Sequence, residues 1–331
     1  MKKISLGVTA LAMSFLGVLF LVAQSTGSHG IVLPPVGSAT LNFNAIAILR
    51  WYPANQTTSF AVGSEPIGIT FDGSDLWVAN QGSNTVTKLK ASDGTLLGTF
   101  NVTTPCYGVF DGANVWVSNY SATSVTKIRA SDGTVLATVG VGSYPQALAF
   151  DGANIWVANN GNGSGNTVSK IQASTGTVLG MFTVGMSPLG VAFDGAHVWV
   201  SNQQGNSVTE LSETGSILRT VAVGSDPTLM AFDGANMWVV NSGSSNVTVV
   251  HTSNGAVWGT VKVGASPSGI AFDGTNMWIG QANGGTTVTK VQVSNGKVLG
   301  TFTAGTSPGT AAFDGANVWV GNEGAGTVSK L

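Results

Sequence analysis

The sequence predicts an all-β fold, a seven-bladed β-propeller, and the main support is an internal repeat. The tripeptide Phe-Asp-Gly recurs seven times, at spacings of 39, 40, 43, 39, 40 and 41 residues. A proline stands five residues before each Phe, and a tryptophan stands six residues after it. Charged residues make up only 8% of the chain, and 46 of its 331 residues are Gly. This composition favours short strands and tight turns over helices.

Each repeat has a constant frame, and a period of about 40 residues is typical of one propeller blade. We number the blades 1 to 7 in chain order. The frame phenylalanines are Phe71, Phe110, Phe150, Phe193, Phe232, Phe272 and Phe313. The prolines are Pro66, Pro105, Pro145, Pro188, Pro227, Pro267 and Pro308. The tryptophans are Trp77, Trp116, Trp156, Trp199, Trp238, Trp278 and Trp319. Amides follow three residues later, at Asn80, Asn119, Asn159, Asn202, Asn241, Gln281 and Asn322.

Four short antiparallel strands are predicted in each repeat, and blade 3 illustrates them. They cover residues 145–150, 155–159, 167–172 and 178–184, and each is rich in Val, Ile, Thr or aromatic residues. An Asp-Gly turn joins the first two strands, because these residues accept the backbone angles of a tight hairpin. A single sheet buries neither face, so neighbouring blades must cover each other. We therefore expect the seven frame tryptophans to pack between blades rather than to hold a ligand.

The ring is expected to close through an N-terminal strand. The last repeat stops at Leu331, after its third strand, and residues 57–63 match the fourth strand of other repeats. This segment can complete blade 7 and leave no blade with a missing strand. Residues 44–50 also align with a third strand. Whether residues 44–50 or 327–331 form the third strand of the closing blade stays open.

The N-terminus predicts export. Met1-Lys2-Lys3 precedes an apolar stretch over residues 4–23, and Ala23-Gln24-Ser25 offers small residues for cleavage. This pattern is typical of a signal peptide over residues 1–25. A tail over 26–43 and the propeller over 44–331 follow. The alternative is an uncleaved membrane anchor, since about 20 apolar residues can span a bilayer. Either way, we expect a periplasmic, cell-surface or extracellular protein.

Charge and cysteine content narrow the function classes. The formal net charge is −2 and no basic run occurs, so nucleic-acid binding through phosphate neutralisation is not expected. The single Cys106 cannot form an intrachain disulfide. We expect a monomer that folds by packing and hydrogen bonding.

Alternating strand direction places the loops at two ends of the ring. The loops between blades and those between second and third strands share one end, which we call the upper end. The Phe-Asp-Gly aspartates then lie at the lower end as turn residues. His29, His197 and His251 are expected in the N-terminal tail, in a lower turn and at the lower end of a third strand. A zinc site or a histidine-based catalytic centre is therefore not predicted.

Three acidic residues are expected at the upper end: Glu65, Asp226 and Glu323. Blades 7 and 1 are neighbours, so Glu65 and Glu323 can approach each other. A pair of carboxylates can hold a divalent cation or act as acid and base. The alternative is that both are solvated loop residues.

Amides and tyrosines, Tyr120 among them, give the upper end a polar and neutral character. Such side chains suit sugars or peptides, although amides at strand ends also satisfy neighbouring backbone groups. The candidate ligand-binding residues are Glu65, Tyr107, Tyr144, Gln146, Asp226, Gln281 and Glu323.

The frame Pro-x4-Phe-Asp-Gly-x2-apolar-Trp-Val-x-Asn, followed by Thr-Val-x-Lys and Gly-Thr-Val-Leu-Gly, resembles the YVTN-type β-propeller repeats of bacterial secreted and surface proteins. It is more distantly similar to streptogramin lyases of the virginiamycin B lyase type, which use a His and Glu pair with magnesium. The lyase motif ends in Glu, where all seven copies here have Asn or Gln. The resemblance therefore implies the fold, and the departure counts against the lyase centre.

Two functions follow as hypotheses. The first is an exported, non-enzymatic binding module without a cofactor, with a neutral glycan or a cell-envelope protein as its ligand. The alternative is a metal-assisted lyase or lactonase-like hydrolase, with a divalent cation held by Glu65 and Glu323.

Overall fold

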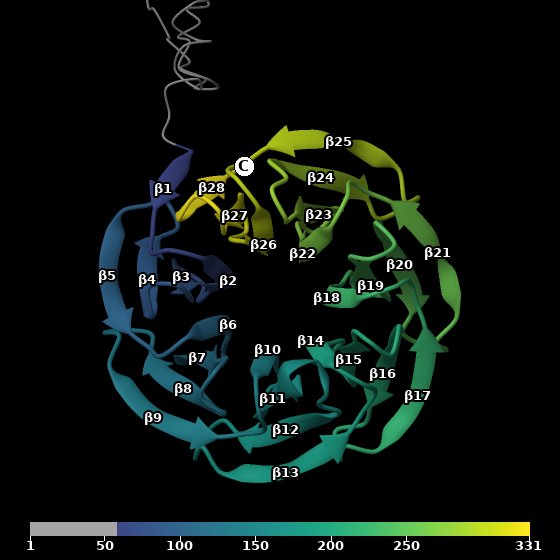
Figure 1. Cartoon of the computed structure of the whole chain (residues 1–331), viewed down its shortest axis with the longest axis horizontal. Coiled ribbons are helices and arrows are strands. Elements are labelled where there is room, and N and C mark those ends of the chain that lie inside the picture. Colours follow the sequence, from purple (N-terminus) through teal and green to yellow (C-terminus); the bar gives the residue numbers. More distant parts are fainter. Residues whose placement is uncertain (1–57) are drawn as a thin grey trace, which may run out of the picture. The chain divides into compact units, whose positions relative to one another are not determined.

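Residues 58–331 are described in the computed structural model, and they form seven four-stranded antiparallel sheets around one axis (Figure 1). The predicted fold class is confirmed. The predictions for residues 1–25, 26–43 and 44–50 lie outside the described residues. Helix in the described part is limited to the single turn η1 (Gly161–Gly163), and no helix there is long and apolar enough to cross a membrane.

In blades 1 to 6 the strands run from the axis outwards in chain order, and in blade 7 the outer strand is the first strand of the described residues. The innermost strands are β2 (Pro66–Phe71), β6 (Pro105–Phe110), β10 (Pro145–Phe150), β14 (Pro188–Phe193), β18 (Pro227–Phe232), β22 (Pro267–Phe272) and β26 (Pro308–Phe313). The second strands are β3 (Asp75–Asn80), β7 (Asn114–Asn119), β11 (Asn154–Asn159), β15 (Val198–Asn202), β19 (Asn236–Asn241), β23 (Asn276–Gln281) and β27 (Val318–Asn322).

The third strands are β4 (Thr85–Lys90), β8 (Ser124–Arg129), β12 (Thr167–Gln172), β16 (Ser207–Leu211), β20 (Asn246–His251), β24 (Thr287–Gln292) and β28 (Thr327–Lys330). The outer strands are β5 (Leu96–Asn101), β9 (Val135–Gly140), β13 (Val178–Thr183), β17 (Ile217–Ala222), β21 (Val257–Lys262), β25 (Val298–Thr303) and β1 (Ser59–Ala61).

Strand β1 closes the ring as predicted. It pairs antiparallel with β28, with Phe60 opposite Val328, and the sheet of blade 7 has the order β1-β28-β27-β26. The third place in the closing blade is thus filled by the C-terminal segment 327–330. The Phe60 ring also lies 5.3 Å from the Trp319 ring, so the closing strand contributes to the core of its blade.

The frame tryptophans are buried in the core between neighbouring blades. Trp77 of blade 1 packs with Val115 and Val117 of blade 2, and Trp156 of blade 3 packs with Val198 of blade 4. Each of the seven indoles donates its N–H to the aspartate of its own Phe-Asp-Gly turn, at 2.7–2.8 Å. This bond fixes the ring and satisfies its one polar atom.

A lysine in the third strand joins neighbouring blades, and we call this contact the lysine bridge. In five blades the ammonium group of this lysine lies over the frame tryptophan ring, with Nζ 4.4–5.1 Å from the ring centroid. The residues are Lys88, Lys127, Lys170, Lys290 and Lys330. Lys88 donates to the backbone oxygen of Ala130 and Lys127 to that of Ala173, both at 2.7 Å. Each of these two bonds crosses to the lower turn of the next blade, so it adds to the packing between sheets.

Candidate functional site

The upper end of each blade presents two adjacent residues on a constant frame. The residue after each frame amide donates its backbone N–H to the carbonyl oxygen of the residue before the frame proline, at 2.9–3.1 Å. These upper pairs are Gln81/Glu65, Tyr120/Thr104, Asn160/Tyr144, Gln203/Ser187, Ser242/Asp226, Ala282/Ser266 and Glu323/Ser307. The backbone contact is repeated, whereas the side chains differ from blade to blade.

The upper loops of residues 58–331 contain no Lys, Arg or His. Their ionisable acids are Glu65, Asp226 and Glu323. The upper loops are therefore neutral to acidic, and they lack the cations that an anionic ligand would need.

Side chains from blades 7, 1, 2 and 3 gather at the upper end beside the axis. We call the set Glu65, Cys106, Tyr120, Tyr144, Gln146 and Glu323 the upper cluster. The Glu323 carboxylate lies directly against Gly309, where any side chain would overlap it. Burial raises the pKa of Glu323 above its usual range, and the charge of Glu65 raises it further. The structure thus brings Glu65 and Glu323 into each other's electrostatic field.

Cys106 is buried at the centre of this cluster, and its Sγ lies 3.6 Å from Gln146 Oε1. Burial, and to a lesser extent the charge of Glu323, raises the pKa of the Cys106 thiol well above its usual range. The thiol is therefore protonated at neutral pH and donates to the Gln146 amide oxygen, so it is not a nucleophile there.

Tyr120 and Tyr144 form an aromatic pair across the boundary between blades 2 and 3. Their ring centroids lie 5.2 Å apart at an interplanar angle of 77°, an edge-to-face arrangement. Burial raises the pKa of Tyr120, with smaller contributions from Cys106 and Tyr144. Both rings are only partly buried, so each leaves apolar surface and a phenol group open to a ligand.

Three other candidates lie apart from the upper cluster or inside the blades. Tyr107 packs against the buried cluster of blades 2 and 3 that includes Leu148. Gln281 is 7% exposed, and its Nε2 donates to Thr289 Oγ1 within blade 6. The frame asparagines make the same kind of bond, as when Asn80 donates to Thr87. Asp226 is exposed, but it belongs to blade 5.

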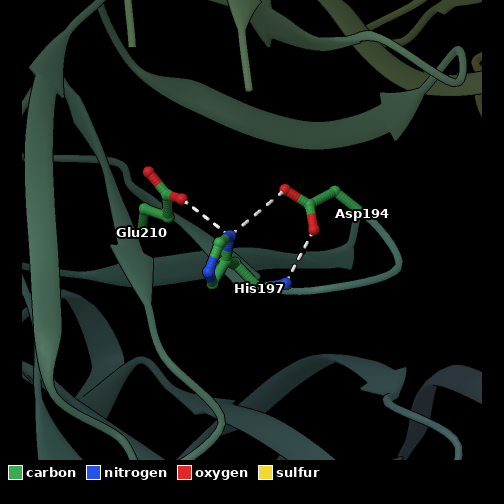
Figure 2. Close-up of side chains that lie close together, drawn as sticks. All are labelled: Asp194, His197 and Glu210. Atoms are coloured by element: carbon green, nitrogen blue, oxygen red, sulfur yellow. Dashed lines mark hydrogen bonds and ion pairs between the residues drawn. The ribbon is translucent and has the colours of Figure 1, made fainter. Parts of the chain in front are cut away.

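At the lower end of blade 4, the structure shows a charged cluster that the sequence interpretation missed. Figure 2 shows His197 between Glu210 and Asp194, with His197 Nδ1 3.0 Å from Glu210 Oε1 and 4.0 Å from Asp194 Oδ2. On the other side, Arg219 Nε lies 2.7 Å from Glu210 Oε2. The Glu210 side chain is fully buried, and burial raises its pKa although Arg219 and His197 lower it.

This arrangement fits an ion cluster better than a metal site. The three groups Asp194, His197 and Glu210 lie close enough to share an ion. However, Asp194 Oδ2 accepts the Trp199 indole N–H at 2.7 Å, and Asp194 Oδ1 accepts backbone N–H groups. The charge of Arg219 also compensates Glu210 already. The buried Glu210 carboxylate thus already has Arg219 and His197 as its close partners.

The signal for this cluster was present in the repeat. Glu210 occupies the position of the bridging lysine, and His197 occupies that of an asparagine, such as Asn154, in most blades. Arg219 stands where the equivalent outer-strand residue is Gly180 in blade 3. A comparison of all seven third strands, rather than of histidines and upper acids alone, would have found it.

No protein-family model and no curated protein sequence matches the chain. Solved structures do. Hydrazine synthase from Kuenenia stuttgartiensis aligns with a TM-score of 0.70 and 19% identity, over 81% of this chain and 95% of that chain. Virginiamycin B lyase from Staphylococcus aureus aligns with a TM-score of 0.69 and 18% identity, over 82% of this chain and 97% of that chain. A streptogramin B lyase structure aligns with a TM-score of 0.71 and 17% identity, over 82% of this chain and 95% of that chain. At such identities the likeness shows the seven-bladed fold alone.

Proposed function

We propose that the chain is an exported, non-enzymatic binding module whose upper cluster takes a neutral glycan or a protein ligand. The observation that supports this most is the contrast at the upper end. The frame repeats in all seven blades, but the upper pairs differ. Their tyrosines and glutamates gather in blades 7, 1, 2 and 3, whereas the third acid, Asp226, lies in blade 5. Variable side chains on a rigid frame are typical of a binding surface.

The chemistry of the upper cluster favours recognition of neutral groups. The Tyr120 and Tyr144 rings offer apolar faces, and Gln146 together with the phenols offers donors and acceptors. In the described residues no histidine lies at the upper end, and the Cys106 thiol is protonated at neutral pH. The groups that a nucleophilic mechanism needs are not gathered there. We also propose a place among the YVTN-type repeat proteins of bacterial surfaces.

The test is a screen of the purified chain on arrays of glycans and cell-envelope peptides, followed by affinity measurement. The double variant Tyr120→Ser/Tyr144→Ser copies residues that other blades carry at these positions, so the frame is preserved. It is expected to weaken the best ligand at least about tenfold, or ~1.4 kcal/mol. The matched control Gln203→Ser/Asp226→Ser, in blades 4 and 5, should leave the affinity unchanged. Unchanged affinity in the tyrosine variant would sink the proposal.

A metal-assisted lyase or lactonase-like hydrolase is the second candidate, and the interaction of Glu65 with Glu323 is what favours it. Two interacting carboxylates attract a divalent cation. A thermal-shift titration with Ca²⁺, Mg²⁺ and EDTA tests this, because a ligand of the folded state raises its stability by mass action. A rise in Tm with metal that Glu65→Gln and Glu323→Gln each abolish would favour the enzyme. Absence of any shift rejects it.

A further inference from the structure

A groove of about 400 Å³ lies on the outer rim, between the outer strand of blade 5 and the lower turn of blade 6. It is lined by Trp258, Gly259, Thr260, Val261, Lys262, Asn295, Gly296 and Val298. Figure 1 shows the two contributing strands, β21 and β25, following one another along the outer edge of the ring. This volume falls in the range of small-molecule binding sites, and the groove lies far from the upper cluster.

Trp258 is placed by a β-bulge. Val249 pairs with Gly259 and Val250 with Val257, so Trp258 is the extra residue of the outer strand. A bulge changes the direction of a side chain, and here it leaves the indole 49% exposed. The same bulge position holds leucine in the other blades with a complete outer strand: Leu97, Leu136, Leu179, Leu218 and Leu299. Among the described tryptophans, Trp258 lies outside the frame and is exposed.

The groove is open because no phenylalanine ring covers the turn glycine at this blade boundary. Blades 1 and 3 have Phe100 and Phe182 at the relevant outer-strand position, whereas blades 2 and 4, like blade 5, have valine there (Val139 and Val221). In blade 1, Phe100 covers the turn glycine of the next blade, and a side chain on Gly133 would overlap its ring. Blade 5 has Val261 at this position. A methyl group on Gly296 would lie 3.2 Å from Val261 Cγ2 and 3.7 Å from Trp258 Cζ3. The indole edge thus rests against Gly296, and the space beside it is free.

We propose that this groove binds a neutral oligosaccharide, with one sugar ring stacked on the indole of Trp258. A half-exposed indole offers a flat apolar face, and the C–H bonds on one side of a pyranose ring are its natural partners. Polar residues also line the groove: Thr260, Lys262 and Asn295. Asn295 is held in place because its Oδ1 accepts the Lys297 backbone N–H at 2.9 Å. Such groups can bind sugar hydroxyls.

An extended peptide that adds a strand to β21 fits less well. Strand β21 is an open sheet edge, which is the usual requirement for strand addition. However, the bulge at Trp258 interrupts one end of this edge, and the exposed Lys262 stands at the other end. Bulges and edge lysines are the devices that hinder strand pairing. The side-chain surface, not the backbone edge, is therefore the binding feature.

The test uses the full chain with cellohexaose, laminarihexaose and chitohexaose as probes, and measures affinity by isothermal titration and tryptophan fluorescence. The variant Trp258→Leu copies five other blades at this position, so folding is preserved. We expect at least one hexasaccharide to bind and to change the fluorescence, and Trp258→Leu to weaken it at least about tenfold. The control Leu218→Trp places an indole at the same bulge in blade 4, and it should add no binding because the Arg219 side chain lies over the turn glycine Gly255 there.

Several outcomes would overturn the assignment. It fails if the affinity is retained in Trp258→Leu, or if none of the three probes binds up to about 10 mM. It also fails if an extended peptide binds at this groove in their place. The Tyr120→Ser/Tyr144→Ser variant should keep the rim affinity, so failure of this site and failure of the upper cluster are separable.

Discussion

At the residue scale, the side chains that repeat in every blade stabilise the fold, and the side chains that differ between blades form the candidate site. The indole of Trp238, for example, donates to Asp233 at 2.7 Å, as the other frame tryptophans do in their blades. Burial raises the pKa of Asp233, but the bonds from Asn236, Trp238 and the backbone outweigh it, and the net pKa is lowered. By contrast, Glu323 has no equivalent acid in the other upper pairs at its position, and its pKa is raised.

The pKa of Glu323 predicts how stability depends on pH. A carboxyl whose pKa is higher in the folded state contributes stability below its unfolded value of 4.5, and this contribution is lost as pH rises through the folded pKa. The substitution Glu323→Gln removes the ionisable group, so this loss of stability with rising pH no longer occurs. We therefore expect the variant to have a higher Tm than the wild type at pH 7 and no advantage at pH 4. A thermal melt at both pH values measures this; an equal difference at both would contradict the assignment.

At the element scale, a third-strand side chain connects neighbouring blades at several boundaries. The lysine bridge joins blades 1 and 2 and blades 2 and 3. In blade 4 the buried Glu210 replaces this lysine and requires His197 and Arg219 as partners. Three positions have therefore changed together, as the cost of a buried charge demands.

Breaking and replacing the blade 4 cluster should have opposite results. Glu210→Gln leaves Arg219 without its counter-charge, and we expect a loss of about 2 to 3 kcal/mol in the free energy of unfolding. The triple variant His197→Asn/Glu210→Lys/Arg219→Gly copies blade 3 and should recover stability to within about 1 kcal/mol of the wild type. Denaturant unfolding measures both. A triple variant as unstable as the single one would contradict this account.

The sequence predicts the elements much better than their side-chain contacts. In blade 3 the second strand begins at Asn154 rather than at residue 155, and the outer strand ends at Thr183 rather than at 184. Proline, Asp-Gly and the alternating apolar residues set these limits locally. The Glu210–Arg219 ion pair joins β16 to β17, and it is visible only once the strand register is known. The contact of Gln281 also depends on the register, because its amide donates to Thr289 of its own blade.

At the scale of the whole molecule, the ring depends on a short closing strand. Strand β1 has three residues, whereas the other outer strands have six. Phe60 anchors it by packing on Trp319 and by covering Gly94 of blade 1. Sequence predicted this closure because residues 57–63 match the outer strands of other blades. Sequence alone could not decide which segment forms the third strand of blade 7, because residues 44–50 and 327–331 have similar patterns.

Loss of the Phe60 ring should loosen blade 7 specifically. Phe100→Ala is the matched control, because Phe100 stacks on Trp77 at 5.5 Å and covers the turn glycine of the next blade in the same way. We expect both variants to lose about 2 to 4 kcal/mol of stability. Only Phe60→Ala should speed hydrogen exchange in β28, because Phe60 belongs to the three-residue strand β1 that pairs with β28. Equal exchange in both variants would show that closure does not depend on this contact.

We propose that ligand binding takes place at the upper cluster of blades 7, 1, 2 and 3. Hydrogen–deuterium exchange of the purified chain, with and without the best ligand from the array screen, tests it most directly. We expect slower exchange in the upper loops around Glu65, Thr104, Tyr120, Tyr144 and Glu323, with no change in the lower turns. Protection confined to the lower turns, or to the blade 4 cluster, would contradict it.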